Sequence, residues 1–297
     1  MPFVNRRDFL KGTVAAGVAA ANSGLANAGK RAGKLATDWV NLGNSGIRVT
    51  RLAFGTGTLG GRVQRELGQD QFTALVRHAY DRGIRFFESA DGYDGMHEML
   101  AEALKGIPRD SYKLMTKMRL RQTDDPRATI DRFRKELNSD YFDILLLHCV
   151  RTPNWPEEFK RLRDAFSEVK EEKIILTHGA SCHGLPPLRA FPGTNWLDVA
   201  LLRINHDGTK MDNLRGDSKE KGEVSEVVSH IEKIHKQGTG VIGMKVMGEG
   251  RFTTAQDREA SLKFVMNLGT VDSVTIGFKA PAEIDEAIER METSLNV

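Results

Sequence analysis

Eight short apolar runs, separated by polar and glycine-containing segments, constrain the fold of this chain more than any other feature. Runs of this length that alternate with longer helical patterns are typical of parallel β-strands joined by crossover helices. Eight such units predict an α/β protein with a parallel (β/α)8 barrel, the TIM-barrel fold. The runs cover residues 52–57, 84–88, 113–118, 142–148, 174–181, 197–204, 241–246 and 273–277.

The segments between the runs carry helical patterns of uneven strength. Pro281 suits the first turn of the last helix. Pro186 and Pro187 shorten the helix expected over residues 185–190. Two segments place apolar residues at helical spacing, namely Phe72, Leu75, Val76 and Ala79, and Ile284, Ala287, Ile288 and Met291.

Residues 39–49 precede the first run and predict a β-hairpin, two short strands around an Asn44-Ser45-Gly46 turn. No tandem repeat and no second domain are evident after it. We therefore assign residues 39–297 to one barrel domain with an N-terminal β-hairpin cap.

The N-terminus has the pattern of an export signal. Asn5-Arg6-Arg7-Asp8-Phe9-Leu10-Lys11 resembles the twin-arginine motif, and a weakly apolar run over residues 12–21 follows it. Ala26-Asn27-Ala28 has the small residues of a signal-peptidase site. We predict a signal peptide over residues 1–28, recognised by the twin-arginine export machinery, and a flexible lead-in over residues 29–38. The mature protein is expected to be periplasmic or extracellular.

Composition excludes two classes of partner. The 297 residues carry a net charge of +3, and removal of residues 1–28 leaves +1, so nucleic-acid binding is not expected. No apolar stretch approaches the roughly 20 residues that span a bilayer, so no stable membrane anchor is expected either.

Four polar side chains stand at or just beyond the ends of three successive strand-like runs. They are Glu88, Tyr93, Lys117 and His148. Because the C-terminal ends of barrel strands share one rim, we expect them to lie together. Hydride reduction of a carbonyl needs a proton donor, and a tyrosine with an ordinary pKa of about 10 serves when a nearby cation lowers its pKa. Lys117 is the candidate cation, Glu88 the acid that orients it, and His148 the hydrogen-bond partner of the carbonyl oxygen.

The short sequence segments around these residues resemble those that carry the active-site tetrad in the aldo-keto reductase superfamily. They are Phe86-Phe87-Glu88-Ser89-Ala90, Met115-Thr116-Lys117 and Asp143-Ile144-Leu145-Leu146-Leu147-His148. The resemblance spans about residues 39–295 and implies a hairpin that closes the bottom of the barrel. It also implies an NAD(P)-dependent oxidoreductase that interconverts a small aldehyde or ketone and its alcohol. One member departs from the pattern, because the family acid is aspartate and this chain has Glu88.

Cofactor binding is expected at the loops after the last two strands, where barrel enzymes commonly hold phosphate groups. Arg251 and Lys279 could pair with phosphate oxygens. Glu283 stands where family members often carry an arginine for the 2′-phosphate, so the sequence leaves NADP and NAD both open. The two loops read Met247-Gly248-Glu249-Gly250-Arg251 and Ile276-Gly277-Phe278-Lys279-Ala280-Pro281.

The nicotinamide side of the expected site departs further from the family. Cys182 follows Ser181 where the family usually has asparagine, Leu201 replaces a frequent glutamine, and Met244 replaces a stacking tyrosine. A thiol is a feeble hydrogen-bond partner, whereas methionine still offers a polarisable apolar surface. The full set of cofactor contacts that the resemblance implies on this side is Gly55, Thr56, Ser181, Cys182, Leu201, Met244 and Lys245.

One other interpretation stays open, and a second is disfavoured. A catalytically degenerate barrel that binds a ligand or nucleotide in the periplasm is the alternative, favoured by Glu88, Cys182, Leu201 and Glu283. A metal centre is not expected, because no carboxylate cluster accompanies the scattered histidines. The polar segment 205–222 is expected to form a solvated loop over the barrel mouth. Cys149 and Cys182 fall on neighbouring strands, where side chains on different faces favour free thiols.

Overall fold

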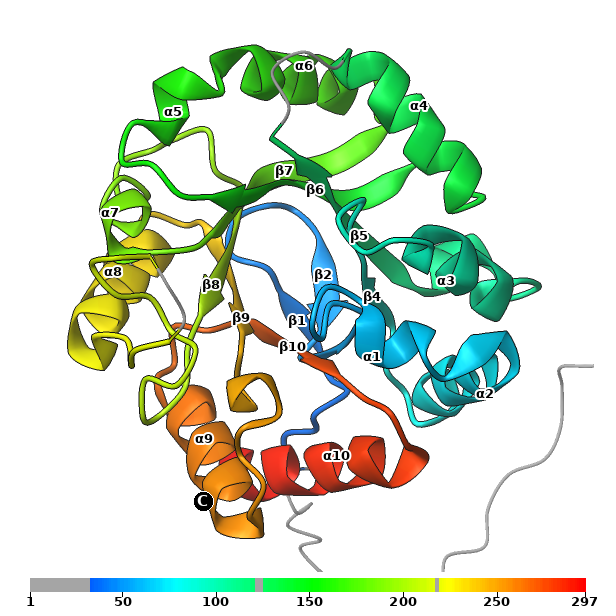
Figure 1. The fold of residues 1–297 in the computed structure, drawn as a ribbon, viewed down its shortest axis with the longest axis vertical. Coiled ribbons are helices and arrows are strands. Elements are labelled where there is room, and N and C mark those ends of the chain that lie inside the picture. The colour runs from blue at the N-terminus through cyan, green and yellow to red at the C-terminus, as the bar shows by residue number, and fades with distance from the viewer. Residues whose placement is uncertain (1–32, 121–124, 217–218) are drawn as a thin grey trace, which may run out of the picture. The chain divides into compact units, whose positions relative to one another are not determined.

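A computed structural model describes residues 33–120, 125–216 and 219–297, and its fold is a closed barrel of parallel strands (Figure 1). The strands follow the order β10-β3-β4-β5-β6-β7-β8-β9 around the barrel. This confirms the predicted (β/α)8 TIM barrel. Their bounds are β3 (Leu52–Gly55), β4 (Phe86–Glu88), β5 (Lys113–Arg119), β6 (Phe142–Val150), β7 (Ile175–Cys182), β8 (Val199–Arg203), β9 (Gly240–Met244) and β10 (Ser273–Gly277).

Helices connect successive strands and surround the barrel in Figure 1. The predicted shortening by Pro186 and Pro187 is confirmed, since the helix after β7 has four residues. The main helices are α2 (Gly68–Asp81), α3 (Met96–Leu104), α4 (Pro126–Glu136), α6 (Lys160–Glu171), α8 (Val224–Lys236), α9 (Ala255–Asn267) and α10 (Pro281–Leu295). Shorter turns are α1 (Arg62–Arg65), η1 (Arg109–Ser111), α5 (Trp155–Glu158), α7 (Leu185–Leu188) and η2 (Gly248–Gly250).

The predicted hairpin, β1 (Trp39–Asn41) and β2 (Arg48–Thr50), closes the bottom of the barrel. The Gly43 amide donates to Asp272 Oδ2 at 3.2 Å, just before β10. The Asn44 amide donates to the Gly238 carbonyl at 2.7 Å, just before β9. Both contacts lie at the N-terminal ends of the strands, so the opposite rim remains available for a site.

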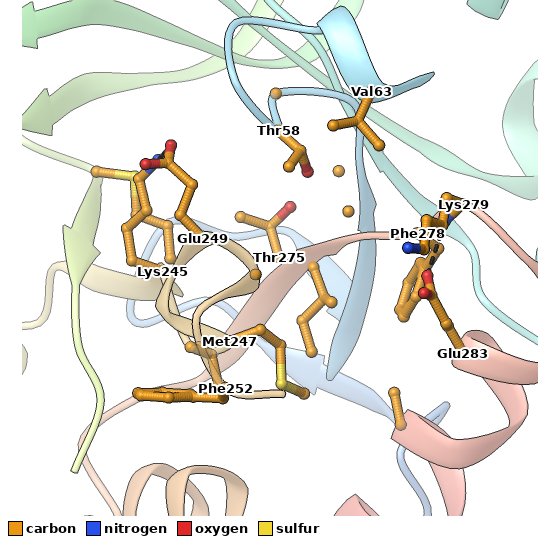
Figure 2. Close-up of a pocket in the computed structure, with 18 of the residues that line it drawn as sticks. Thr58, Val63, Lys245, Met247, Glu249, Phe252, Thr275, Phe278, Lys279 and Glu283 are labelled. Atoms are coloured by element: carbon orange, nitrogen blue, oxygen red, sulfur yellow. Dashed lines mark hydrogen bonds and ion pairs between the residues drawn. The ribbon is translucent and has the colours of Figure 1, made fainter. Parts of the chain in front are cut away.

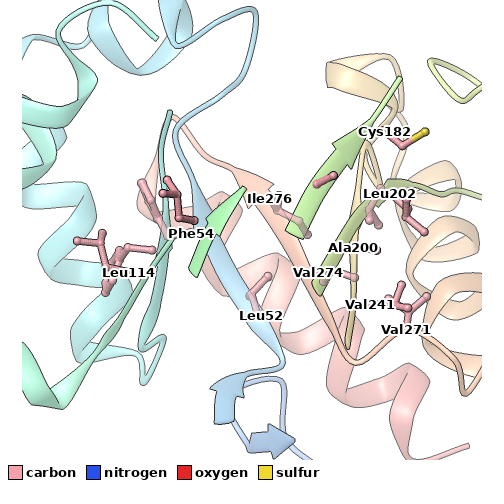
Figure 3. Close-up of a cluster of buried hydrophobic side chains, with 14 of the residues drawn as sticks. Leu52, Phe54, Leu114, Cys182, Ala200, Leu202, Val241, Val271, Val274 and Ile276 are labelled. Atoms are coloured by element: carbon pink, nitrogen blue, oxygen red, sulfur yellow. The ribbon is translucent and has the colours of Figure 1, made fainter. Parts of the chain in front are cut away.

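The core has two apolar layers because the side chains of each strand alternate between two faces. One layer fills the barrel and includes Phe86, Ile144 and Leu146, with Leu42 of the hairpin beneath them. The other lies between the strands and the helices, where Figure 3 shows strand side chains such as Leu202 and Val241. The inner layer fills the barrel, so the site has to lie above it.

The predicted signal peptide and the first part of the lead-in lie outside the described residues. The described part, residues 33–38, is docked rather than flexible. The Lys34 amide donates to Asn296 Oδ1 at 2.8 Å, and the Asn296 side-chain amide donates to the Lys34 carbonyl at 2.9 Å. Ala36 is fully buried, and its carbonyl accepts from the Leu52 amide at 2.9 Å. These pairs hold the segment against the end of α10 and the start of β3.

Candidate active site

Three adjacent strands bring the predicted acid, lysine and histidine to one rim. Glu88 ends β4, Lys117 lies in β5 and His148 lies in β6. The Lys117 ammonium is ion-paired with Glu88 Oε1 and donates to the Ser89 carbonyl at 2.8 Å. Glu88 Oε2 accepts from the Thr275 hydroxyl at 3.3 Å. Both members of the ion pair are buried, so the pair is a fixed part of the site.

Tyr93 comes from the loop before α3 and completes the group of four. Lys117 Nζ lies 4.8 Å from the centre of its ring. The His148 ring meets it edge to face, with 5.5 Å between ring centres. A Cβ on Gly57 would lie 2.5 Å from the Tyr93 hydroxyl oxygen, so this close approach requires glycine. The structure therefore brings together all four residues predicted for the tetrad.

The protonation states of these groups follow mainly from burial. Burial raises the pKa of Tyr93 well above its ordinary value of 10.0, and the Glu88 charge raises it further. Burial also lowers the pKa of Lys117, an effect that Glu88 opposes. The pKa of His148 falls well below 6.5 through burial and the neighbouring cations. The direction for Tyr93 is thus opposite to the lowering expected from Lys117, because burial raises the pKa and the Glu88 charge adds to that rise.

A cavity of about 550 Å³ opens beside Tyr93 and extends beneath the loops after β9 and β10. Figure 2 shows Lys245 and Glu249 on one side of it, and Lys279 and Glu283 on the other. Glu88 and Tyr93 line its inner end. The predicted cofactor residues in its lining are Gly55, Leu201, Met244, Lys245, Gly250, Gly277, Phe278, Lys279 and Glu283.

Five predicted cofactor residues, Thr56, Ser181, Cys182, Gly248 and Arg251, are not in this lining. The Thr56 hydroxyl is buried and donates to Ser89 Oγ at 3.2 Å. Ser181 Oγ accepts from the Cys149 amide at 2.8 Å. Cys182 is buried in the layer between strands and helices, as Figure 3 shows, which differs from a contact with the nicotinamide. Gly248 is buried and Arg251 is exposed.

The sequence analysis missed several charged residues that line the cavity. Arg258 of α9 and Arg290 of α10 both pair with Glu286, at 2.8 and 2.7 Å. All three line the cavity near Glu283. Lys245 is ion-paired with Glu249 across the turn after β9. Arginines on the outer helices have the pattern of ordinary surface residues, so no sequence signal distinguishes them.

Other classes of site find no support among the residues that the structure describes. Within those residues, no group of three or more His, Cys, Asp and Glu side chains could hold a metal ion. No helix of the described chain is long and apolar enough to cross a membrane. Cys149 and Cys182 are free thiols, as predicted.

Comparison with known proteins identifies both parts of the chain. Residues 51–296, which include the whole barrel, match the aldo/keto reductase family. The chain belongs to the aldo/keto reductase family. Residues 4–21 match the twin-arginine translocation pathway signal sequence. The resemblances drawn from the tetrad words and from the paired arginines are therefore confirmed.

Relatives of known name are similar over part of their length. L-galactose dehydrogenase of Arabidopsis thaliana is 32% identical over 141 residues, 44% of this chain and 44% of that protein. Probable aldo-keto reductase 1 of Glycine max is 29% identical over 170 residues, 51% of this chain and 49% of that protein. The alignments thus span about half the length of these relatives.

Solved structures share the aldo/keto reductase fold over most of the chain. A putative aldo-keto reductase from Pseudomonas aeruginosa has a TM-score of 0.69, with 19% identity, over 89% of this chain and 98% of that chain. An aldo-keto reductase from Klebsiella pneumoniae in complex with NADPH has a TM-score of 0.64, with 15% identity, over 85% and 89%. At these identities the comparison establishes the fold alone.

Proposed function

We propose that this protein is an NAD(P)-dependent oxidoreductase that interconverts an aldehyde or ketone and its alcohol. One observation carries the proposal: Tyr93, in contact with His148, lines the same cavity as the loops after β9 and β10. The candidate proton donor therefore lines a cavity that is large enough for a cofactor. A bound nicotinamide would supply or accept the hydride.

The tetrad residues have distinct roles in this proposal. Tyr93 is protonated at neutral pH because its pKa is raised, and a protonated phenol is the form that donates to a carbonyl oxygen. His148 is neutral because its pKa is lowered, so one ring nitrogen can hold a proton for the same oxygen. The ion pair with Glu88 holds Lys117 in place, and the Lys117 ammonium faces the Tyr93 ring.

The cavity fits a nicotinamide dinucleotide in size and lining. Ligand pockets generally measure about 300–1,000 Å³, and this one measures about 550 Å³. Leu201, Met244 and Phe278 give it apolar surfaces for flat rings. Gly250 has a φ of +82° and no atom within 4 Å of a would-be Cβ, so a phosphate could approach its backbone closely.

The adenosine end of such a ligand would meet mixed charges. Glu283 lines this end and accepts from the Lys279 amide at 2.8 Å, which leaves an acid near the start of α10. Arg258 and Arg290 are cations there, but Glu286 already pairs with both. An acid beside the ribose disfavours a 2′-phosphate, so we expect little preference for NADP over NAD.

Export would place this chemistry outside the cytoplasm. The match to a twin-arginine signal supports recognition by the twin-arginine machinery and a periplasmic or extracellular location. That route serves proteins that fold before transport, so the cofactor would be loaded in the cytoplasm and carried across with the barrel.

Fluorescence titration with NADH and NADPH, followed by turnover of simple aldehydes, tests the proposal. We expect submillimolar binding of at least one nucleotide, and turnover that Tyr93→Phe lowers by about 10²–10⁴-fold while nucleotide binding persists. If neither nucleotide binds at millimolar concentration, the proposal fails. The barrel would then be better described as a ligand-binding protein without catalysis.

A further inference from the structure

Two arginines lie on the side of the barrel rim away from the cofactor cavity. Arg119 is the last residue of β5, and Arg151 directly follows β6. In the strand order, β5 and β6 stand opposite β9 and β10, whose loops cover the cavity (Figure 1). His148 of β6 therefore has the cavity on one side, through Tyr93, and this pair of arginines on the other.

Arg119 lies next to the place where the carbonyl oxygen would bind. A Cβ on Gly92 would lie 2.9 Å from His148 Cε1 and 3.4 Å from Arg119 Nε, so one glycine separates the two side chains. Arg119 pairs with two carboxylates of the described chain: its Nε lies 3.8 Å from Asp91 Oδ1, and its Nη2 donates to Asp94 Oδ1 at 3.4 Å. A guanidinium has five N–H donors, so Arg119 keeps donors for a further ligand beside these two contacts.

Arg151 carries a charge with less compensation. Its Nη2 lies 3.9 Å from the Cys149 sulfur, which directly follows His148 in the chain. Among residues 33–120, 125–216 and 219–297, no carboxylate lies within ion-pair distance of it. The side chain is exposed, so its planar fork of donors can meet a ligand. Both arginines, with Lys117, lower the pKa of His148, so their charge acts at the reacting centre.

We propose that the substrate is an anionic carbonyl compound, an aldehyde or ketone whose carboxylate pairs with Arg151 and Arg119. The inference rests on the proposed function and names its substrate class. The carbonyl would lie between Tyr93 and His148, and the rest of the molecule would extend toward the ends of β5 and β6. A guanidinium binds a carboxylate through two parallel hydrogen bonds, which would orient the substrate as well as hold it.

A matched pair of compounds tests the proposal. 4-Carboxybenzaldehyde and its methyl ester have similar shapes, but only the acid is charged at neutral pH. Steady-state kinetics of both would be measured with the wild-type holoenzyme, Arg151→Met and Arg151→Lys. Arg48→Met is the control, because it removes one positive charge at the bottom of the barrel, where Arg48 donates to the Trp39 carbonyl.

We expect kcat/KM for the acid to exceed that for the ester by about 10- to 100-fold, the usual strength of a hydrogen bond to a charged group. Arg151→Met should remove this preference through KM, with kcat unchanged, because the contact binds substrate and transition state alike. Arg151→Lys should keep part of it, and Arg48→Met all of it. Added salt should raise KM for the acid only.

Two results would overturn the inference while leaving the oxidoreductase itself intact. One is equal kcat/KM for acid and ester, and the other is a preference for the acid that survives Arg151→Met. If the enzyme turns over neither compound, calorimetric binding of 4-(hydroxymethyl)benzoate and its methyl ester decides. Binding of the acid that is lost in Arg151→Met supports an anion site, and equal or absent binding of both contradicts it.

Discussion

The ammonium nitrogen of Lys117 lies 4.8 Å from the centre of the Tyr93 ring while it is ion-paired with Glu88. The cation thus faces the ring, and a carboxylate of opposite charge stands beside it. Burial and Glu88 together raise the pKa of Tyr93, so the phenol keeps its proton until a substrate takes it. Tyr93 is therefore protonated at neutral pH and can act as a proton donor.

Replacement of Tyr93 by phenylalanine removes the hydroxyl and keeps the ring that packs against His148. General acid catalysis typically contributes about 10²–10⁴-fold, so carbonyl reduction should fall by that factor. Folding should be unchanged, which circular dichroism and thermal unfolding would check. Unaltered turnover in Tyr93→Phe would exclude this tyrosine as the donor.

Replacement of Lys117 by methionine should destabilise the fold by about 3–5 kcal/mol, because it leaves the buried Glu88 without its partner. Adding Glu88→Gln to that variant should restore much of the loss. Urea unfolding of both single variants and the double variant gives the coupling energy. A double variant no more stable than Lys117→Met would show that the pair is not coupled.

Replacement of Glu283 by arginine should shift the affinity ratio toward NADPH by about tenfold or more, since it exchanges repulsion of the 2′-phosphate for attraction. Glu283→Gln is the matched control and should give a smaller shift in the same direction. Titration of NADH and NADPH against the three proteins measures it. A strong preference for NADPH in the wild type would mean that Arg258 or Arg290 grips the phosphate.

The raised pKa of the buried Asp212 should make the stability of the fold depend on pH. Burial raises its pKa from 3.8 to about 6, although Arg203 opposes the shift. The folded state therefore binds a proton more tightly than the unfolded state between these values. Stability should fall as pH rises from about 4 to 6, by up to about 3 kcal/mol relative to Asp212→Asn. Urea unfolding of both proteins at pH 4, 5, 6 and 7 would measure the free energy of unfolding at each pH. The same pH dependence in the wild type and in Asp212→Asn would contradict the prediction.

Protein recovered from the exported fraction should retain about one nucleotide per chain, because little free cofactor is available outside the cytoplasm. A ligand at 100 times its dissociation constant adds about 2.7 kcal/mol of stability. Absorbance and mass spectrometry of the acid extract would measure occupancy. Protein that arrives empty yet binds added nucleotide would show that loading occurs after export.

The barrel was predictable because its strands are continuous apolar runs, as parallel strands buried on both faces must be. The tetrad was predictable because Glu88, Lys117 and His148 occupy equivalent strand ends. The face on which a side chain near a strand end lies was harder to predict. In β6 the pairing with β7 shifts between Leu147 and Val150, where Cys149 has a φ of +70°, and no sequence pattern announces such an irregularity.

The loops after β9 and β10 follow the strands that the sequence predicts, but their backbone differs in detail from the prediction. The sequence predicts a strand over residues 241–246. In the structure β9 ends at Met244, because the next residue, Lys245, has a φ of +61°. Glu249 has a φ of +56° in the same turn. Left-handed backbone at non-glycine residues depends on tertiary contacts, here including the Lys245–Glu249 pair. Arg258 and Arg290 were likewise invisible, since only the packing of α9 against α10 brings them to the cavity.

The pair of hydrogen bonds between Lys34 and Asn296 joins positions 262 residues apart. The backbone that follows the export signal can therefore dock only after almost the whole chain has been synthesised and its last helix packed. Docking of residues 33–38 therefore reports that the C-terminal helix has folded.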